Sequence, residues 1–296
     1  MRNTIPLFLT LLTAVPASAA DSGAFAAWVA NEYRVSPNLT YKVASGAEQM
    51  LDVYHRRDSS TPTPTVIYIH GGGWVGGSKE ASVLRIAPYL EMGFNVVNVE
   101  YRLGRVARAP AAVEDCRCAL RWVYRNAETY GIDTSKLVLT GASAGGHLSL
   151  TTGMLQTSAG FDAECISNVE PKVAAIVNYY GITDVADLMA GKPNEKSYTV
   201  SWLGSQTDRE KIADAVSPIR HVRREVPPIL TIHGDADRIV PYAHATELHR
   251  RLEEAGAVNE LLTIPGGGHG GFSMAETEKI DAAIRAFLST HGLMPN

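Results

Sequence analysis

Leu-Val-Leu-Thr-Gly-Ala-Ser-Ala-Gly-Gly-His, at residues 137–147, is the stretch that decides the fold. Its apolar start is typical of a buried strand, and a helical pattern begins at His147, directly after the glycines. A strand, a sharp glycine-flanked turn and a helix in this order lift a serine hydroxyl clear of the sheet edge, next to a helix N-terminus that favours negative charge. A glycine-rich turn alone would explain the glycines but not the serine. The stretch therefore predicts Ser143 as a nucleophile.

The rest of the chain alternates short apolar runs with amphipathic segments. Continuous apolar runs, rather than strict alternation, are typical of strands covered on both faces, as in a parallel sheet flanked by helices. Helical patterns that stop at Gly131 and Gly256 separate some of these runs. We therefore predict a doubly wound, mostly parallel α/β sheet. The expected strands are residues 51–54, 66–69, 96–99, 137–139, 173–177, 229–232 and 261–264.

The acid and the base of a catalytic triad are expected in loops after the later strands. Asp237 lies deep in the loop after residues 229–232, and we prefer it over Asp235, which is typical of a turn carboxylate that accepts local N–H groups. Asp184, after the preceding strand, is a third candidate. His269 stands among glycines after the last expected strand, where an imidazole can project toward the serine. The order serine, acid, histidine is that of a serine hydrolase built on such a sheet.

The segment His-Gly-Gly-Gly-Trp, at residues 70–74, follows an apolar strand and supplies backbone donors. Consecutive glycines let the main chain approach a substrate closely. We expect the N–H groups of Gly72, Gly73 and Ala144 to form an oxyanion hole. The segment lacks the Gly-Lys-Ser/Thr ending that a phosphate-binding loop requires.

Three aromatic residues are candidates for substrate binding. Trp74 follows the glycine loop, and its indole is predicted either to pack in the core or to form a wall of the acyl pocket. Tyr179 and Tyr180 stand at the end of an expected strand, where they could provide aromatic walls for a planar acid. Ordinary packing is the alternative for both tyrosines.

The other histidines are predicted to be structural, and no metal or other cofactor is expected. His147 falls on the helix after the nucleophile, whereas His70 and His233 end strands. His244 and His249 are five residues apart with no glutamate placed as a general base, which is not the spacing of a metal-dependent hydrolase.

Composition favours one catalytic domain that acts on a small molecule. The chain has 296 residues, 45% of them hydrophobic and 20% charged, which is enough for one large α/β core. The formal net charge is -4 and no dense Lys/Arg run occurs, so nothing favours nucleic acid or an anionic membrane as a partner. The expected strands at residues 173–177 and 229–232 are separated by more residues than one crossover helix requires. We expect this insert, roughly residues 184–226, to cover the site.

The first twenty residues have the pattern of a secretory signal peptide, with Arg2, an apolar stretch and a small-residue end at residues 17–20. The apolar stretch is shorter than the roughly 20 residues of a membrane span, and no later segment qualifies. We therefore expect residues 21–296 to form the mature catalytic domain, secreted or periplasmic. Within it, residues 21–45 are expected to form a short helix around residues 25–33, followed by a connector.

Three cysteines in an oxidising compartment permit one disulfide. Cys116 and Cys118 lie two apart on an expected helix and point to different faces, so they should not pair with each other. Cys116 is in register with the core stripe of this helix, whereas Cys118 lies off it. We therefore favour a disulfide between Cys118 and Cys165.

The motifs together resemble the α/β-hydrolase superfamily, from about residue 51 to residue 288. The glycine loop with Gly-Ala-Ser-Ala-Gly-Gly at residues 141–146 looks like bacterial carboxylesterases related to hormone-sensitive lipase, and more closely like feruloyl and acetyl-xylan esterases. Enzymes of the hormone-sensitive lipase type usually carry an acidic residue where Ala142 stands, and a longer N-terminal cap. The resemblance implies an exported esterase with an open pocket for short-acyl or aromatic esters, either small molecules or linked to polysaccharide.

The residues and the resemblance together predict an acyl-enzyme mechanism carried by Ser143, His269 and Asp237. A triad does not by itself distinguish esters from amides, so an amide or peptide hydrolase of the same fold is one alternative. An inert binding protein is the other, although such proteins usually lose a triad residue and none is missing here.

Overall fold

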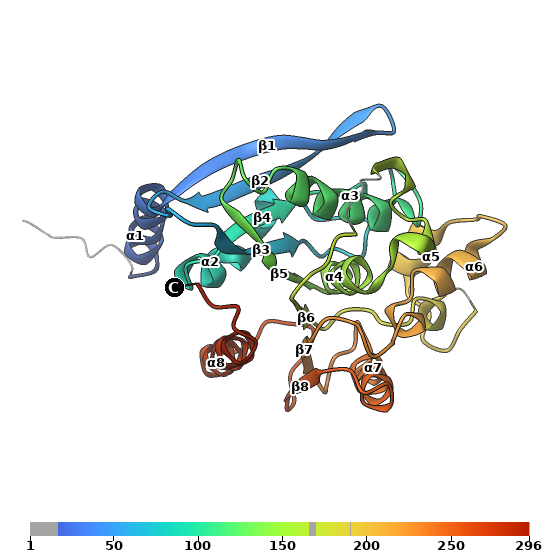
Figure 1. Cartoon of the computed structure of the whole chain (residues 1–296). Helices are drawn as coiled ribbons and strands as arrows, with labels where there is room; N and C mark the ends of the chain where they lie inside the picture. The colour runs from blue at the N-terminus through green and yellow to red at the C-terminus, as the bar shows by residue number, and fades with distance from the viewer. Residues whose placement is uncertain (1–16, 166–169, 190, 296) are drawn as a thin grey trace, which may run out of the picture.

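A computed structural model describes residues 17–165, 170–189 and 191–295 (Figure 1). Its centre is an eight-stranded sheet in the order β1-β2-β4-β3-β5-β6-β7-β8. The strands from β4 to β8 in this order run parallel, and the hairpin β1-β2 joins them antiparallel at β4. The strands are β1 (Tyr33–Ala44), β2 (Ala47–Arg56), β3 (Thr63–Ile69), β4 (Asn95–Val99), β5 (Ile132–Ala142), β6 (Ala175–Tyr179), β7 (Ile229–Gly234) and β8 (Asn259–Ile264).

Helices cover both faces of the sheet. On β3, Ile67 and Ile69 pack in a core with α3, α4 and α7, whereas Val66 and Tyr68 pack in a second core with α2 and α8 (Figure 1). The strands are therefore buried on both sides, and the prediction of a doubly wound, mostly parallel sheet is confirmed. The helices are α1 (Ala17–Glu32), α2 (Val83–Glu91), α3 (Ala111–Arg125), α4 (Ala144–Met154), α5 (Ser197–Leu203), α6 (Arg209–Ala215), α7 (Ala243–Glu254) and α8 (Met274–Thr290).

The N-terminal region confirms one expectation and corrects another. The expected helix around residues 25–33 corresponds to α1, but the expected connector is the edge strand β1. Its exposed positions include the polar residues Arg34, Asn38 and Thr40 but also two valines, Val35 and Val43. The strand contains Pro37, which an edge strand tolerates because one row of its N–H groups has no neighbouring strand to donate to. A tight turn at Ser45 and Gly46, both with positive φ, returns the chain into β2. Residues 1–16 of the predicted signal peptide lie outside the described residues.

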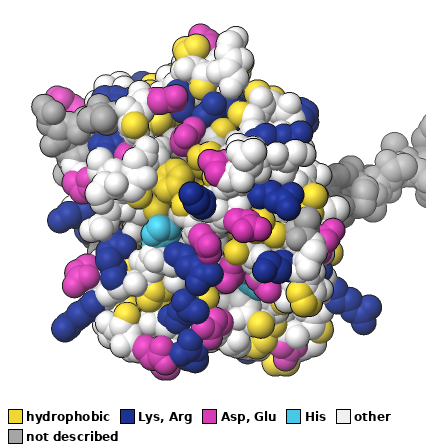
Figure 2. Space-filling view, turned by 90° about the vertical axis from the view of Figure 1, so that its right-hand side faces the viewer, with side chains coloured by type: hydrophobic (Ala, Val, Ile, Leu, Met, Phe, Trp, Pro, Cys, Tyr) yellow, Lys and Arg dark blue, Asp and Glu magenta, His cyan; other side chains and the backbone are white. Residues whose placement is uncertain are grey.

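The segment predicted as an insert, residues 184–226, contains α5 and α6 and connects β6 to β7. Its Trp202 is fully buried and stacks on Trp74, with 4.2 Å between ring centroids. On the face near α5 and α6, basic and acidic side chains are intermixed (Figure 2). None of the helices in the described part of the chain is long and apolar enough to span a bilayer.

A disulfide joins Cys118 of α3 to Cys165, which confirms the predicted pairing. Cys165 ends a short 3-10 helix, Ala163–Cys165, so the bond fixes the loop after α4 to α3. Cys118 itself is fully buried in the core, although the sequence placed it off the core stripe. Cys116 is free and buried in the core.

Thiol titration of the denatured but unreduced protein is expected to find one thiol per chain, from Cys116. Reduction before titration should raise the count to the three cysteines of the sequence. Three thiols without reduction would contradict the disulfide, because denaturation exposes every thiol that is not oxidised.

Candidate active site

Ser143 stands at the pivot of a tight turn between β5 and α4. Its backbone has φ 59° and ψ -121°, a region in which residues other than glycine are rare. The neighbouring glycines are required by packing, since a Cβ on Gly141 would lie 2.4 Å and a Cβ on Gly145 2.1 Å from the carbonyl oxygen of Ile69. The end of β3 therefore presses against both sides of the turn, and the serine hydroxyl is displayed at the carboxyl edge of the sheet.

Three side chains from separate loops form a hydrogen-bonded row. The Oγ of Ser143 lies 2.9 Å from Nε2 of His269, and Nδ1 of His269 lies 2.7 Å from Oδ2 of Asp237. Because the carboxylate can only accept, Nδ1–H is the donor and Nε2 is left to accept the serine proton. The structure thus brings the predicted nucleophile, base and acid together in the geometry of a Ser-His-Asp triad.

The Asp237 carboxylate is held by donors on both oxygens. Its Oδ1 accepts the N–H groups of Ile239 and Val240 at 2.7 and 3.0 Å. Burial by itself would raise the pKa of Asp237, but hydrogen bonds from His233, His269 and the N–H of Ile239 lower it well below its ordinary value. The carboxylate therefore stays ionised across the physiological range and keeps the imidazole of His269 oriented.

His233 was predicted to be a structural residue, and its contact with Asp237 was not foreseen from the sequence. It is fully buried at the end of β7, and its Nε2 lies 3.2 Å from Oδ2 of Asp237 and 3.1 Å from the carbonyl oxygen of Val240. Two imidazoles thus meet the same carboxylate oxygen. The sequence shows only that His233 lies four residues before Asp237. In a loop this spacing does not predict a contact, so the contact could be recognised only from the fold.

The two other candidate acids lie elsewhere. Asp235 is exposed, and its Oδ1 accepts the N–H of Gly266 at 2.6 Å, a contact to the loop after β8 rather than the local turn contact that was the alternative for it. Asp184 accepts the N–H of Asp187 at 3.2 Å. Only Asp237 contacts the histidine of the row.

The glycine loop lies beside the serine and points its backbone into the same cleft. Gly72 and Gly73 have φ values of 117° and 59°, and the carbonyl oxygen of Gly72 accepts two N–H groups that close a tight turn. Within the described residues, no protein acceptor is found for the N–H groups of Gly72, Gly73 or Ala144, the first residue of α4. These three donors are therefore available to a bound oxyanion.

Trp74 packs in the core, so the prediction that it forms a wall of the acyl pocket is wrong. Its indole is fully buried between the insert and α4, and its Nε1–H donates to Nδ1 of His147 at 3.0 Å. His147 in turn donates from Nε2 to the carbonyl oxygen of Val216 at 2.7 Å, and burial lowers its pKa to about 3, so it is neutral at physiological pH. This chain of contacts fixes the glycine loop from behind, as expected for structural residues.

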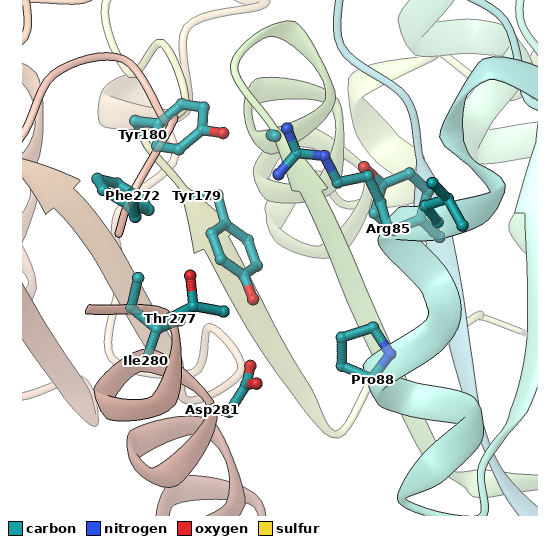
Figure 3. A pocket seen from close by; sticks show the side chains of 11 residues that line it. Arg85, Pro88, Tyr179, Tyr180, Phe272, Thr277, Ile280 and Asp281 are labelled. Atoms are coloured by element: carbon teal, nitrogen blue, oxygen red, sulfur yellow. The ribbon is translucent and has the colours of Figure 1, made fainter. Parts of the chain in front are cut away.

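A cleft of about 550 Å³ opens over the row. A smaller side pocket of about 190 Å³ lies beside it between α2 and α8, and the two share Tyr68, Arg85, Ala142 and Tyr180 as lining residues (Figure 3). Tyr179 lines the side pocket, so both predicted tyrosines, unlike Trp74, reach space that a substrate can enter. The cleft is lined by Tyr68, Gly71, Gly72, Gly73, Ala81, Ser82, Arg85, Ala142, Ser143, Tyr180, Tyr198, Ile239 and His269.

No group of three or more His, Cys, Asp or Glu side chains in residues 17–165, 170–189 and 191–295 is arranged to hold a metal ion. The chemistry that this arrangement supports is nucleophilic attack by a serine hydroxyl on a carbonyl carbon, with proton transfer through an oriented imidazole.

The known proteins that this chain is similar to include esterases, whose chemistry agrees with the arrangement of Ser143, His269 and Asp237. Esterase LipC of Mycobacterium tuberculosis is 33% identical over 81% of this chain, and an ethyl acetate hydrolase of Pseudomonas putida is 26% identical over 84% of this chain and 79% of its own length. A truncated carbohydrate esterase from gut microbiota superposes with a TM-score of 0.71 and 27% identity, covering 88% of this chain and 98% of that one. The chain spans 62% of the length of LipC, and about half to three fifths of the mycobacterial esterases that it matches.

The family assignment rests on most of the catalytic region. The sequence matches the BD-FAE family over residues 51–252, which includes the glycine loop, the serine turn and the loop of Asp237. The strand order and the position of the serine turn are those of an α/β-hydrolase. The chain belongs to the BD-FAE family of α/β-hydrolases.

Proposed function

We propose that this protein is a secreted or periplasmic serine carboxylesterase that hydrolyses short-acyl or aromatic esters. The observation that carries the proposal is the hydrogen-bonded row Ser143–His269–Asp237, which faces a cleft lined by backbone N–H donors. The esterase names of LipC and of the ethyl acetate hydrolase support ester over amide chemistry. A complete row argues against an inert binding protein, because such a protein has no need of the strained serine turn.

In the first half of the reaction, Oγ of Ser143 attacks the ester carbonyl carbon while its proton passes to Nε2 of His269. The carbonyl π electrons move to the oxygen, which is stabilised by the N–H groups of Gly72, Gly73 and Ala144. Collapse of this intermediate breaks the bond to the alcohol oxygen, which takes the proton from His269. The alcohol leaves, and the acyl group remains on Ser143.

In the second half, water attacks the acyl-enzyme with His269 again as the base. The tetrahedral intermediate collapses, Oγ of Ser143 recovers the proton, and the carboxylic acid is released. Asp237 holds the imidazole in one tautomer and stabilises the imidazolium in both halves, and it remains ionised because its pKa is lowered.

The size of the two cavities supports a short or flat acyl group. A side pocket of about 190 Å³ is smaller than the range of roughly 300–1,000 Å³ typical of sites for drug-sized ligands. Its walls are largely apolar and aromatic, with Tyr179, Tyr180 and Phe272 among them. Such a pocket suits an acetyl group or a single ring, whereas a long acyl chain would extend into solvent.

Two observations support export. The first twenty residues have the pattern of a signal peptide, and the disulfide between Cys118 and Cys165 is of a kind that forms and persists in oxidising compartments. The likeness to a carbohydrate esterase supports a polysaccharide-linked ester as one natural substrate class.

A panel of p-nitrophenyl esters tests the proposal. We expect kcat/KM to be highest from acetate to butyrate and to fall by about tenfold or more at long chains, because methylenes that are not buried contribute none of the roughly 0.8 kcal/mol available to each. Methyl ferulate and acetylated xylan are measured beside them, with p-nitroacetanilide as the amide control. A maximum at dodecanoate, or faster cleavage of the amide than of the acetate, would contradict the proposal.

A further inference from the structure

The side pocket has largely apolar walls, with Arg85 near its Tyr180 end and a carboxylate at the other end. Pro88 of α2 and Tyr179, Phe272 and Ile280 form its walls, and Asp281 of α8 lies at the end farthest from Tyr180 (Figure 3). Figure 3 shows the carboxylate directed into the space below the ring of Tyr179. A ligand that fills this pocket from the cleft therefore passes Arg85, which lines both cavities, then packs against the apolar rings and reaches the carboxylate last.

The Asp281 carboxylate has no partner of its own in the described part of the chain, where no hydrogen bond or ion pair reaches it. It is half-buried, and burial raises its pKa although Arg285 opposes the shift. An unpaired carboxylate beside apolar rings is unfavourable, because its desolvation is not offset by a donor. Such a residue, at the end of a pocket that opens beside the nucleophile, is best explained by a donor that arrives with the substrate.

The acyl group is the part of an ester that fits this place. The alcohol leaves first and exits through the wider cleft, whereas the acyl group stays bonded to Ser143 until water attacks. Ala142, which directly precedes Ser143, lines both the cleft and the side pocket. The narrow pocket is therefore placed to retain the group that remains attached.

We propose that the side pocket binds the acyl group and that Asp281 selects acyl groups with a hydrogen-bond donor, such as a ring hydroxyl, at their distal end. The inference rests on the proposed esterase activity and adds a specificity-determining residue to it. A hydroxyl donates to the carboxylate at the pocket floor, while the ring packs against Tyr179 and Phe272. An acyl group that ends in a methoxyl fills the same space but offers no proton.

The test compares matched pairs of esters that differ only at the distal atom. Methyl 4-hydroxycinnamate is compared with methyl 4-methoxycinnamate, and methyl 4-hydroxybenzoate with its methoxy analogue, so that two ring-to-ester spacings are sampled. At least one pair should show a preference of about tenfold or more in kcat/KM for the hydroxyl, the scale of one hydrogen bond to a charged group.

Asp281→Leu should abolish this preference, and Asp281→Asn, which keeps an acceptor oxygen but loses the charge, should reduce it to an intermediate value. The ratio of kcat/KM for the two esters of a pair does not depend on what fraction of a variant is folded. If Asp281→Leu does not fold, Asp281→Asn still tests the inference. Glu278→Leu is the matched control, because Glu278 is an exposed carboxylate of the same helix that lies outside the pocket. This variant should keep the wild-type ratio of kcat/KM between the hydroxyl and methoxyl esters.

Two outcomes would overturn the inference, namely no hydroxyl preference in either pair with the wild-type protein, or a preference that survives in Asp281→Leu. Both are distinguishable from failure of the proposed function, in which the wild-type protein would not hydrolyse p-nitrophenyl acetate at all.

Discussion

Ser143→Ala is expected to lower kcat on p-nitrophenyl acetate by about 10⁴-fold or more, because members of a triad act as a unit and, among the residues that the structure describes, Ser143 is the one whose hydroxyl is hydrogen-bonded to His269. The substitution keeps the Cβ and removes one oxygen, so the turn between β5 and α4 keeps its packing against Ile69. The far-ultraviolet circular dichroism and the midpoint of thermal unfolding should therefore stay close to those of the wild-type protein.

Ser158→Ala is the matched control for this substitution. Ser158 is exposed on the short 3-10 helix Thr157–Ala159, away from the cleft, and its variant should keep wild-type kcat. Retention of a tenth of the activity by Ser143→Ala in a correctly folded protein would move the nucleophile to another residue.

Asp237→Asn is expected to lower kcat by roughly 10⁴-fold, the scale of the same change in a Ser-His-Asp triad. The amide oxygen is expected to take the place of Oδ1, because the N–H groups of Ile239 and Val240 donate there. The amide NH₂ then faces Nδ1 of His269, which has to accept. The imidazole proton moves to Nε2 and points at the serine, so the ring can no longer take the proton of Oγ.

Asp235→Asn provides the comparison, since Asp235 lies two residues before Asp237, and its carboxylate accepts the N–H of Gly266 rather than contacting His269. Its amide oxygen can still accept that bond, and kcat should change by less than about threefold, as expected when one exposed hydrogen bond is kept. The reverse ranking of the two variants would assign the orienting carboxylate to Asp235.

The juxtaposition of serine, acid and histidine could be predicted because it depends on topology. Parallel strands bring all their carboxyl ends to one edge, and β5, β7 and β8 lie within four consecutive positions of the sheet, so the loops that follow them lie close together at that edge. The choice of Asp237 over Asp235 followed from its deeper place in the loop, which the contacts of the two carboxylates explain.

The features that could not be predicted depend on how elements pack. The side pocket is formed by α2 and α8, which are far apart in the sequence and carry no motif. Trp74 has no local feature that separates a buried indole from one at a pocket wall, and only the stacking on Trp202 decides between them. The edge strand β1 escaped prediction because its exposed polar positions and Pro37 resemble those of a loop.

The positive φ of 59° at Ser143 lowers the stability of the folded protein but places the serine hydroxyl where the reaction needs it. A residue other than glycine in such a conformation costs about 1–3 kcal/mol, and a glycine there would relieve most of it. Selection for a robust fold alone would therefore replace this serine, and only selection for turnover retains it. A lineage of this family that has lost its substrate would be expected to drift first at this position, so a serine here is evidence of a working enzyme rather than of shared ancestry.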